Sequence, residues 1–123
     1  MAVLELTKVN FDKVIADNDI VLIDFWAEWC EPCKAFAVVY ARLAEEYPSL
    51  IFGKVDIQQE PELADDFNIR SIPQLIVIRQ NIVVASETGA MPADILRDLI
   101  EQVSALDMNK LRKELENEER GDL

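Results

Sequence analysis

The chain has 123 residues, and half of them are hydrophobic, which suits a single domain with its own core. Its formal net charge of −12 argues against nucleic acid and anionic membranes as partners, because both attract clustered lysine and arginine. No apolar run approaches the roughly 20 residues of a membrane-spanning helix, and the first residues lack the pattern of a secretory signal. We therefore expect a soluble, cytoplasmic protein, whose charge either maintains solubility or steers it toward basic partners.

The chain contains two cysteines and no histidine, and this narrows its chemistry. Ser-His-Asp and Cys-His catalysis are excluded, and the commonest metal ligand is missing. A structural zinc site needs about four ligands, usually from two cysteine pairs or added histidines, so zinc is a minor alternative. A domain of this size also needs no disulfide scaffold, which leaves redox chemistry as the leading interpretation.

The first part of the chain is predicted to form a strand, a helix and a second strand. Residues 3–6 could form a short strand, and a helix follows over residues 11–17 with Asn10 as its expected N-cap. Residues 20–26 are apolar on both alternating faces, which is typical of a strand buried on both sides of a parallel sheet.

The middle of the chain continues this alternation. Apolar residues recur at helical spacing over residues 32–47, Pro32 suits the first turn of that helix, and Pro48 ends it. Residues 50–56 are predicted to form a strand, and residues 61–67 a short helix that opens on a proline.

The last part is predicted to be a hairpin and a helix. The apolar strands 75–78 and 82–85 flank a short gap at Gln80-Asn81, which favours an antiparallel pair. A final helix opens at Pro92. Its expected inner face is Ile95, Leu96, Leu99 and Val103.

The resulting order, β-α-β-α-β-α-β-β-α, predicts an α/β domain over residues 1–105 with a mixed sheet and helices on both faces. Residues 106–123 differ, because ten of these eighteen residues are charged and Leu111 and Leu115 form an isolated apolar pair. We expect a frayed, solvated extension of the last helix whose removal from Asp107 onward changes little; a helix that docks on a partner is the alternative.

Cys30 and Cys33 follow a buried strand and open a helix. A helix N-terminus offers unpaired N–H groups and the positive end of the dipole, so it favours the Cys30 thiolate, which is the attacking species. Cys33 is close enough in the chain to resolve a mixed disulfide, and Pro32 limits the motion between the two cysteines.

Asp24 is an unusual residue for its position. It places a carboxylate inside the eight-residue run Ile20 to Ala27, which is otherwise apolar. Burial of an unpaired carboxylate costs several kcal/mol or raises its pKa, so such a residue is a candidate for a functional role. An exposed aspartate at the end of the strand is the alternative.

Three segments, in this order, resemble the thioredoxin family. Residues 25–34, FWAEWCEPCK, are similar to the family's active-site stretch, and residues 70–75, RSIPQL, are similar to its cis-proline loop. The similarity continues through Thr88-Gly89-Ala90 and covers about residues 2–105. The resemblance implies the thioredoxin fold and a thiol–disulfide oxidoreductase that reduces protein disulfides.

The resemblance also implies roles for single residues. Cys30 would attack, Cys33 would resolve, and Asp24 would be a buried carboxylate that exchanges protons with Cys33, with Lys54 facing it. Pro73 would be cis and packed opposite the disulfide, which would leave the Ile72 backbone free to pair with a client strand. The implied client-contact residues are Trp29, Pro32, Ile72, Pro73 and Gly89.

The sequence departs from the family at three places that hold no reacting group. Glu31 stands where glycine is commonest, Val38 where a helix-kinking proline is frequent, and Gln80-Asn81-Ile82 where the hairpin usually carries Asn-Gly. These departures bear on the redox potential and on recognition by a reductase.

The resemblance implies disulfide-containing client proteins and a thioredoxin reductase as partners, and a monomeric state. It implies no bound cofactor or metal, because the redox-active Cys30–Cys33 disulfide carries the electrons. Two alternatives remain open at this point. One is a client-binding module or chaperone with incidental redox activity, and the other is a reductant dedicated to one client.

Overall fold

The computed structural model describes residues 2–120, which form a five-stranded sheet with the order β1-β3-β2-β4-β5. The strands are β1 (Val3–Glu5), β2 (Ile20–Trp26), β3 (Ile51–Asp56), β4 (Gln74–Arg79) and β5 (Ile82–Thr88). The helices are α1 (Phe11–Asp17), α2 (Glu31–Glu46), α3 (Pro61–Asp66), α4 (Ala93–Ser104) and α5 (Met108–Arg120).

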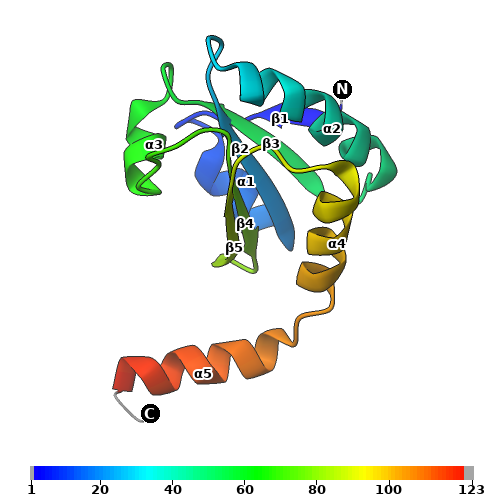
Figure 1. Cartoon of the computed structure of the whole chain (residues 1–123). Coiled ribbons are helices and arrows are strands. Elements are labelled where there is room, and N and C mark those ends of the chain that lie inside the picture. Colours follow the sequence, from blue (N-terminus) through cyan, green and yellow to red (C-terminus); the bar gives the residue numbers. More distant parts are fainter. Residues whose placement is uncertain (1, 121–123) are drawn as a thin grey trace.

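The sheet is mixed, as the order of elements predicted. Strands β1, β3 and β2 run parallel, whereas β4 and β5 pair antiparallel. Helices α2 and α4 cover one face and α1 and α3 the other (Figure 1). The predicted α/β class and the helices on both faces are therefore confirmed.

Alternation along β2 builds two cores. Leu22 faces α2 and α4 and packs with Phe36 and Leu96, while Ile23 and Phe25 face α1 and α3. Because side chains alternate along a strand, position 24 falls on the same face as position 22, beneath α2. The central strand thus carries Asp24 into the interior.

Two local expectations were wrong. Asn10 occupies the N-cap position of α1, but its side chain accepts from the Thr7 N–H at 2.8 Å and donates to the Glu5 carbonyl, so it ties the preceding loop and does not cap the helix. Ile95 is 51% exposed, and Ile100 takes its place on the inner face of α4. Helix α4 is therefore rotated relative to the expected face by its packing against the sheet.

The hairpin turn between β4 and β5 contains two residues with positive φ values. Gln80 and Asn81 have φ values of 51° and 68°. Positive φ at both central residues is the condition for a type I′ turn, the connection that matches the twist of two antiparallel strands. The predicted hairpin is confirmed, without the Asn-Gly pair that usually builds it.

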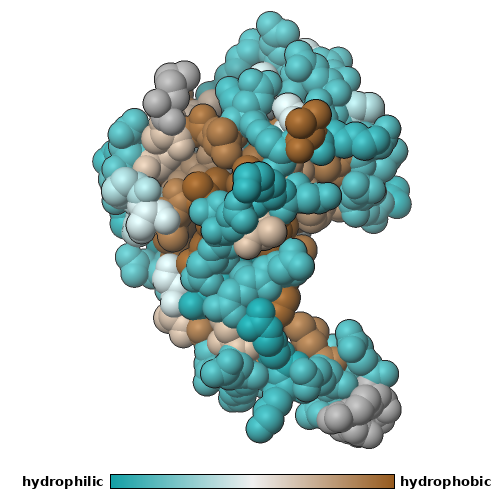
Figure 2. All heavy atoms as spheres, turned by 180° about the vertical axis from the view of Figure 1, so that it is seen from behind, coloured by the Kyte–Doolittle hydropathy of each residue, from teal (hydrophilic) through white to brown (hydrophobic). Residues whose placement is uncertain are grey.

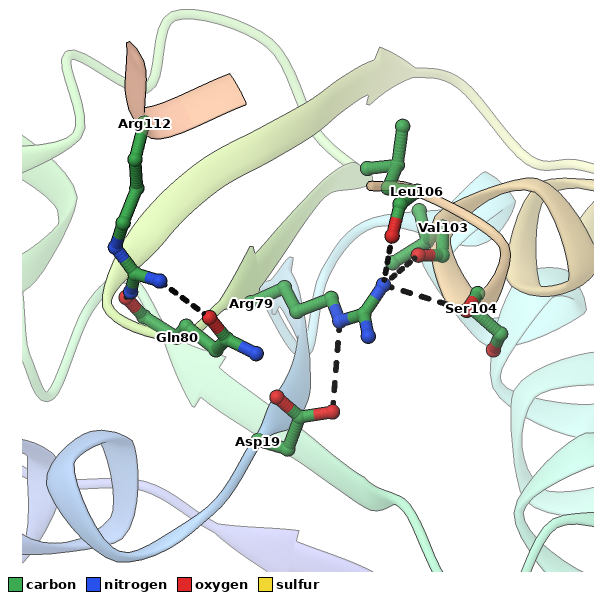
Figure 3. Close-up of polar contacts among 7 residues, drawn as sticks. All are labelled: Asp19, Arg79, Gln80, Val103, Ser104, Leu106 and Arg112. Carbon is green, nitrogen blue, oxygen red and sulfur yellow. Dashed lines mark hydrogen bonds and ion pairs between the residues drawn. The ribbon is translucent and has the colours of Figure 1, made fainter. Parts of the chain in front are cut away.

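Arg79, at the end of β4, joins three elements at the end of the sheet remote from the cysteines (Figure 3). Its Nη1 donates to the carbonyls of Val103 at 2.9 Å, Ser104 at 3.3 Å and Leu106 at 3.0 Å, and its Nε lies 3.4 Å from the Asp19 carboxylate. Val103 and Ser104 end α4 and Leu106 follows it, at the C-terminal end of a helix, where a cation is favoured. Arg79 therefore holds the turn that ends α4.

The chain then forms a separate helix, α5, and does not continue α4. Asp107 accepts from the Lys110 N–H at 3.1 Å, and Arg112 donates to Gln80 in the hairpin turn. On the face of α5 seen in Figure 2, hydrophobic side chains lie on the side turned toward the domain and hydrophilic ones lie on the outer side. Met108 is only 5% exposed, whereas Leu111 and Leu115 are half-buried.

Within residues 2–120 no helix is long and apolar enough to cross a membrane.

Met108 changes the expectation for removal of the tail. Deletion of residues 107–123 should lower the free energy of unfolding by about 2 kcal/mol, the worth of one buried methionine side chain. Deletion of residues 114–123 keeps Met108 and Arg112 and should change it by less than about 0.5 kcal/mol. Urea unfolding of both truncated chains, with Met108→Ala in the full chain as control, checks this. Equal effects of the two deletions would contradict it.

Candidate active site

Cys30 and Cys33 lie where β2 leads into α2. Cys30 has extended backbone angles and is the N-cap of α2, and its Sγ accepts from the Cys33 N–H at 3.2 Å. Pro32 stands in the first turn, where its missing N–H breaks no helical hydrogen bond. The Cys30 sulfur thus occupies the place that a capping oxygen takes in other helices, next to unpaired N–H groups.

The two cysteines are joined in a disulfide and are almost inaccessible, at 5% exposed for Cys30 and 2% for Cys33. They pack with Ala27 and against Trp26 and Ile72. Trp29 differs from these neighbours because it is 63% exposed beside the disulfide. An exposed tryptophan next to a reactive pair offers apolar area to a partner molecule.

A second loop closes on the cysteines. The Ile72–Pro73 bond is cis, as the family resemblance implied, and the Ile72 carbonyl lies 3.9 Å from the Cys30 sulfur. The Gly89 N–H donates to the Pro73 carbonyl at 2.8 Å. Gly89 has a φ of 98°, which a residue with a Cβ rarely adopts. The structure thus brings Ile72, Pro73 and Gly89 together beside Cys30, with Pro73 itself buried. Pro32, in the first turn of α2, is exposed.

Asp24 is buried, with 3% of its surface exposed, and pairs across the sheet with Lys54 on β3. Among the described residues its Oδ1 has no hydrogen-bond partner. Burial raises the pKa of Asp24 to about 7, and the Lys54 charge opposes that rise. The carboxyl can therefore hold or release a proton near neutral pH.

A small hollow lies between Asp24 and Cys33. It has a volume of about 120 Å³ and is lined by Asp24, Trp26, Cys33, Lys34, Ala37 and Lys54. The Lys54 Nζ lies 5.2 Å from the centre of the Trp26 ring, which is the geometry of a cation–π contact. Asp24 and Lys54, which the family resemblance places face to face, thus line the same hollow as Cys33.

Glu31 and Lys34 flank the disulfide on its solvent side. Their side chains form an ion pair at 3.2 Å, and Glu31 is 83% exposed. Water screens such a pair, so it contributes little to stability, but it places a carboxylate near the Cys30 sulfur.

Sequence reasoning missed Tyr40, Ala37 and Ala41 on α2. Tyr40 is buried and donates its hydroxyl proton to the Gly53 carbonyl at 2.7 Å. With Asp24 it lines a second, larger hollow beneath the two alanines. The sequence signal that could have pointed to these residues is a tyrosine and two small residues that follow Cys33 on α2.

The thioredoxin family model matches residues 2–102, which include the cysteines, Asp24 and the cis-proline loop. This chain belongs to the thioredoxin family. It is 53% identical over 110 residues to putative thioredoxin 2 of Streptomyces coelicolor, a match that covers 89% of the chain and 82% of that protein. It is 39% identical over 102 residues to a thioredoxin of Buchnera aphidicola, with 81% and 94% covered.

Solved thioredoxin structures have the same architecture. Thioredoxin f from spinach chloroplast superposes with a TM-score of 0.77 at 37% identity, over 84% of this chain and 94% of that one. Plasmodium falciparum thioredoxin gives 0.75 at 35% identity, over 80% and 97%. The predicted thioredoxin fold is confirmed.

Together, the family and the Cys30–Cys33 pair identify a thiol–disulfide oxidoreductase that acts as a protein-disulfide reductase. Within residues 2–120 no group of three or more cysteine, aspartate or glutamate side chains is placed to hold a metal ion. In this thioredoxin-family chain the pair that can form a disulfide is the electron carrier.

The Asp24→Asn variant should be more stable than the parent chain at pH 8, by on the order of 4 kcal/mol. The folded-state pKa of about 7 lies above the ordinary value of 3.8, so stability falls as the pH rises between these values and stays low above them. The gain should therefore vanish near pH 4. Urea unfolding of both proteins from pH 4 to 8 measures it, and a gain that is constant with pH would contradict the burial of a titrating carboxyl.

The Glu31→Gly variant should have a reduction potential higher by on the order of 10 mV and a lower Cys30 pKa. The thiolate exists only in the reduced state, so a nearby carboxylate destabilises that state, and Lys34 offsets part of the effect. Equilibration of both proteins with a glutathione buffer measures the difference. It should shrink in high salt, because exposed charges are screened; a fall in potential would exclude this explanation.

Proposed function

We propose that Cys30 attacks client disulfides, that Cys33 resolves the mixed disulfide, and that Asp24 takes the Cys33 proton. The observation that carries this proposal is the placement of the Cys30 sulfur at the N-terminus of α2, with Asp24 and Cys33 around one hollow behind it. Each step follows from where these groups lie.

The attack begins with the reduced protein. The Cys30 thiolate is stabilised by the Cys33 N–H and the positive end of α2, and it attacks one sulfur of a client disulfide. A Cys30–client mixed disulfide forms, and the second client sulfur leaves as a thiolate. Cys33 is less suited to this attack because it lies within the first turn of α2 and not at its N-cap.

The second step releases the client. The Cys33 thiol passes its proton to Asp24, and the resulting thiolate attacks the Cys30 sulfur. The Cys30–Cys33 disulfide forms, and the first client sulfur leaves, so the client gains two electrons. Lys54, next to Asp24 in the sheet, favours the ionised carboxylate that must accept the proton.

The client would bind across Trp29 and the cis-proline loop. Strand β4 begins at Gln74, so the Ile72 backbone lies just outside its ladder and can pair with an extended client segment. Trp29, Ile72 and Gly89 supply apolar and backbone contacts around the disulfide. We assign Pro32 to the rim of this surface and Pro73 to its support.

The partners follow from the reaction. A thioredoxin reductase would return the disulfide to the dithiol, and the client would be any protein with an accessible disulfide. We assign residues 1–105 to the catalytic domain and residues 106–123 to a charged extension outside the site. We also propose that the protein is a monomer. We place it in the cytoplasm, because a reducing compartment keeps the dithiol form available.

The Cys33→Ser variant should accumulate mixed disulfides with clients, because Cys30 can attack but the intermediate cannot be resolved. Gel electrophoresis without reductant, followed by peptide mapping of the cross-link, should place every client on Cys30. The spectrum of trapped proteins separates a general reductant from one dedicated to a single client.

Two matched variants complete this test. Cys30→Ser should trap no client and should lose insulin reduction, whereas Asp24→Asn should resolve mixed disulfides about 100-fold more slowly, at the lower end of acid–base contributions. Client cross-links through Cys33 would reverse the two roles. Insulin reduction that survives in Cys30→Ser would refute the mechanism.

A further inference from the structure

The larger hollow beside Asp24 lies between α2 and the edge of the sheet formed by β1 and β3. Its volume is about 300 Å³, and its walls are Ala2, Val3, Asp24, Ala37, Tyr40, Ala41, Glu45 and Lys54. At roughly 30 Å³ for each liquid water molecule, it has room for several. No cysteine lines this hollow, although Asp24 does.

The sequence of α2 explains why the hollow exists. Cys33, Ala37, Ala41 and Glu45 recur at four-residue intervals, so they stack on one face of the helix. The two alanines leave space above Asp24 that longer side chains would fill. At 1.5 Å per residue, Glu45 lies about 18 Å along the helix from Cys33.

The hollow also has the polar groups that water needs. The Asp24 Oδ1 is buried without a hydrogen-bond partner among the described residues, and Asp24 lines the hollow. Tyr40 on α2, Lys54 on β3 and Glu45 at the far end supply further polar or charged groups. Burial raises the pKa of Tyr40 well above its usual range, so its hydroxyl stays neutral and bonded to Gly53.

The smaller hollow cannot serve the same purpose during a reaction. It shares Asp24, Ala37 and Lys54 with the larger hollow, and its other walls are Trp26, Cys33 and Lys34. These three residues lie around the disulfide, where a client bound as proposed would cover them. A proton that Asp24 holds at that moment needs another way to solvent.

We propose that Asp24 exchanges its proton with solvent through the larger hollow, along Ala37 and Ala41 to the Glu45 end of α2, while a client covers the cysteines. This passage rests on the proposed proton role of Asp24 and deepens it. The Cys33 proton passes to the carboxylate, then to water in the hollow, and then to bulk solvent, so the carboxylate is free for the next cycle. Ala37 and Ala41 act as positioning residues, because they keep the passage open and touch neither sulfur.

Single-turnover reduction of two disulfides at pH 6.5 tests the passage. This pH lies below the Asp24 pKa of about 7, so protonated Asp24 carboxyls outnumber ionised ones in the free protein, and these must release the proton after the client binds. Insulin covers the active-site face, whereas cystamine is too small to do so. Ala41→Leu, which fills the hollow from α2, should slow insulin reduction at least threefold and leave cystamine reduction unchanged.

One further variant repeats the test from strand β1, and a second serves as the control for the added side chain. Val3→Phe fills the hollow from β1 and should reproduce the split between the two substrates, so the test does not depend on one variant folding. Ala35→Leu adds the same side chain at an exposed position of α2 outside the walls of the hollow, and should change neither rate. Equal slowing of both substrates, or no slowing of insulin, would overturn the passage.

The Asp24→Asn variant separates the two proposals. If it reduces both disulfides as fast as the parent chain, the proton role of Asp24 is wrong and the passage falls with it. If it is slow with both while Ala41→Leu and Val3→Phe match the parent chain, the passage alone is wrong.

Discussion

The junction between the central strand β2 and the helix α2 is the constraint on which the site depends. Strand β2 is buried and ends at Trp26, four residues before α2, and the Cys30 N–H donates to the Ala27 carbonyl at 3.2 Å, so Cys30 falls at the N-terminus of the helix. The same register places Asp24 under α2 and beside Lys54. One strand thus positions the Cys30 sulfur and the buried carboxyl together.

Burial of Asp24 lowers the stability of the folded state at higher pH, but it also gives the protein a carboxyl with a pKa of about 7. A carboxyl whose pKa is about 7 is kept at a cost to the folded state at higher pH, where an amide or an apolar side chain would be better tolerated. The two hollows around it show how the packing accommodates this group: one touches Cys33, and the other runs under the alanines of α2. The packing beneath α2 is therefore looser around the buried carboxyl.

Most of the architecture could be predicted from local patterns. Apolar periodicity located the strands and helices through α4, and the apolar run around Asp24 predicted its burial. Two errors have the same cause. Asn10 and Ile95 were assigned from spacing within their own segments, but tertiary contacts decide which neighbour a side chain chooses: Asn10 binds back to Thr7, and α4 turns Ile100 inward instead of Ile95. The separate helix α5 follows a turn held by Arg79, which lies 24 to 27 residues from its acceptors, and begins with the buried Met108.

The sequence by itself determined the chemistry: two cysteines at a helix start, no histidine, and one carboxylate in an apolar strand. These are properties of residue type and near-neighbour spacing, which the chain carries before it folds. Only the tertiary structure decided that Asp24, Lys54 and Cys33 meet at one hollow, and that Ile72 and Gly89 close on Cys30 from loops about 40 and 60 residues away. The reason is that sheet pairing and helix packing bring together residues whose proximity no local pattern encodes.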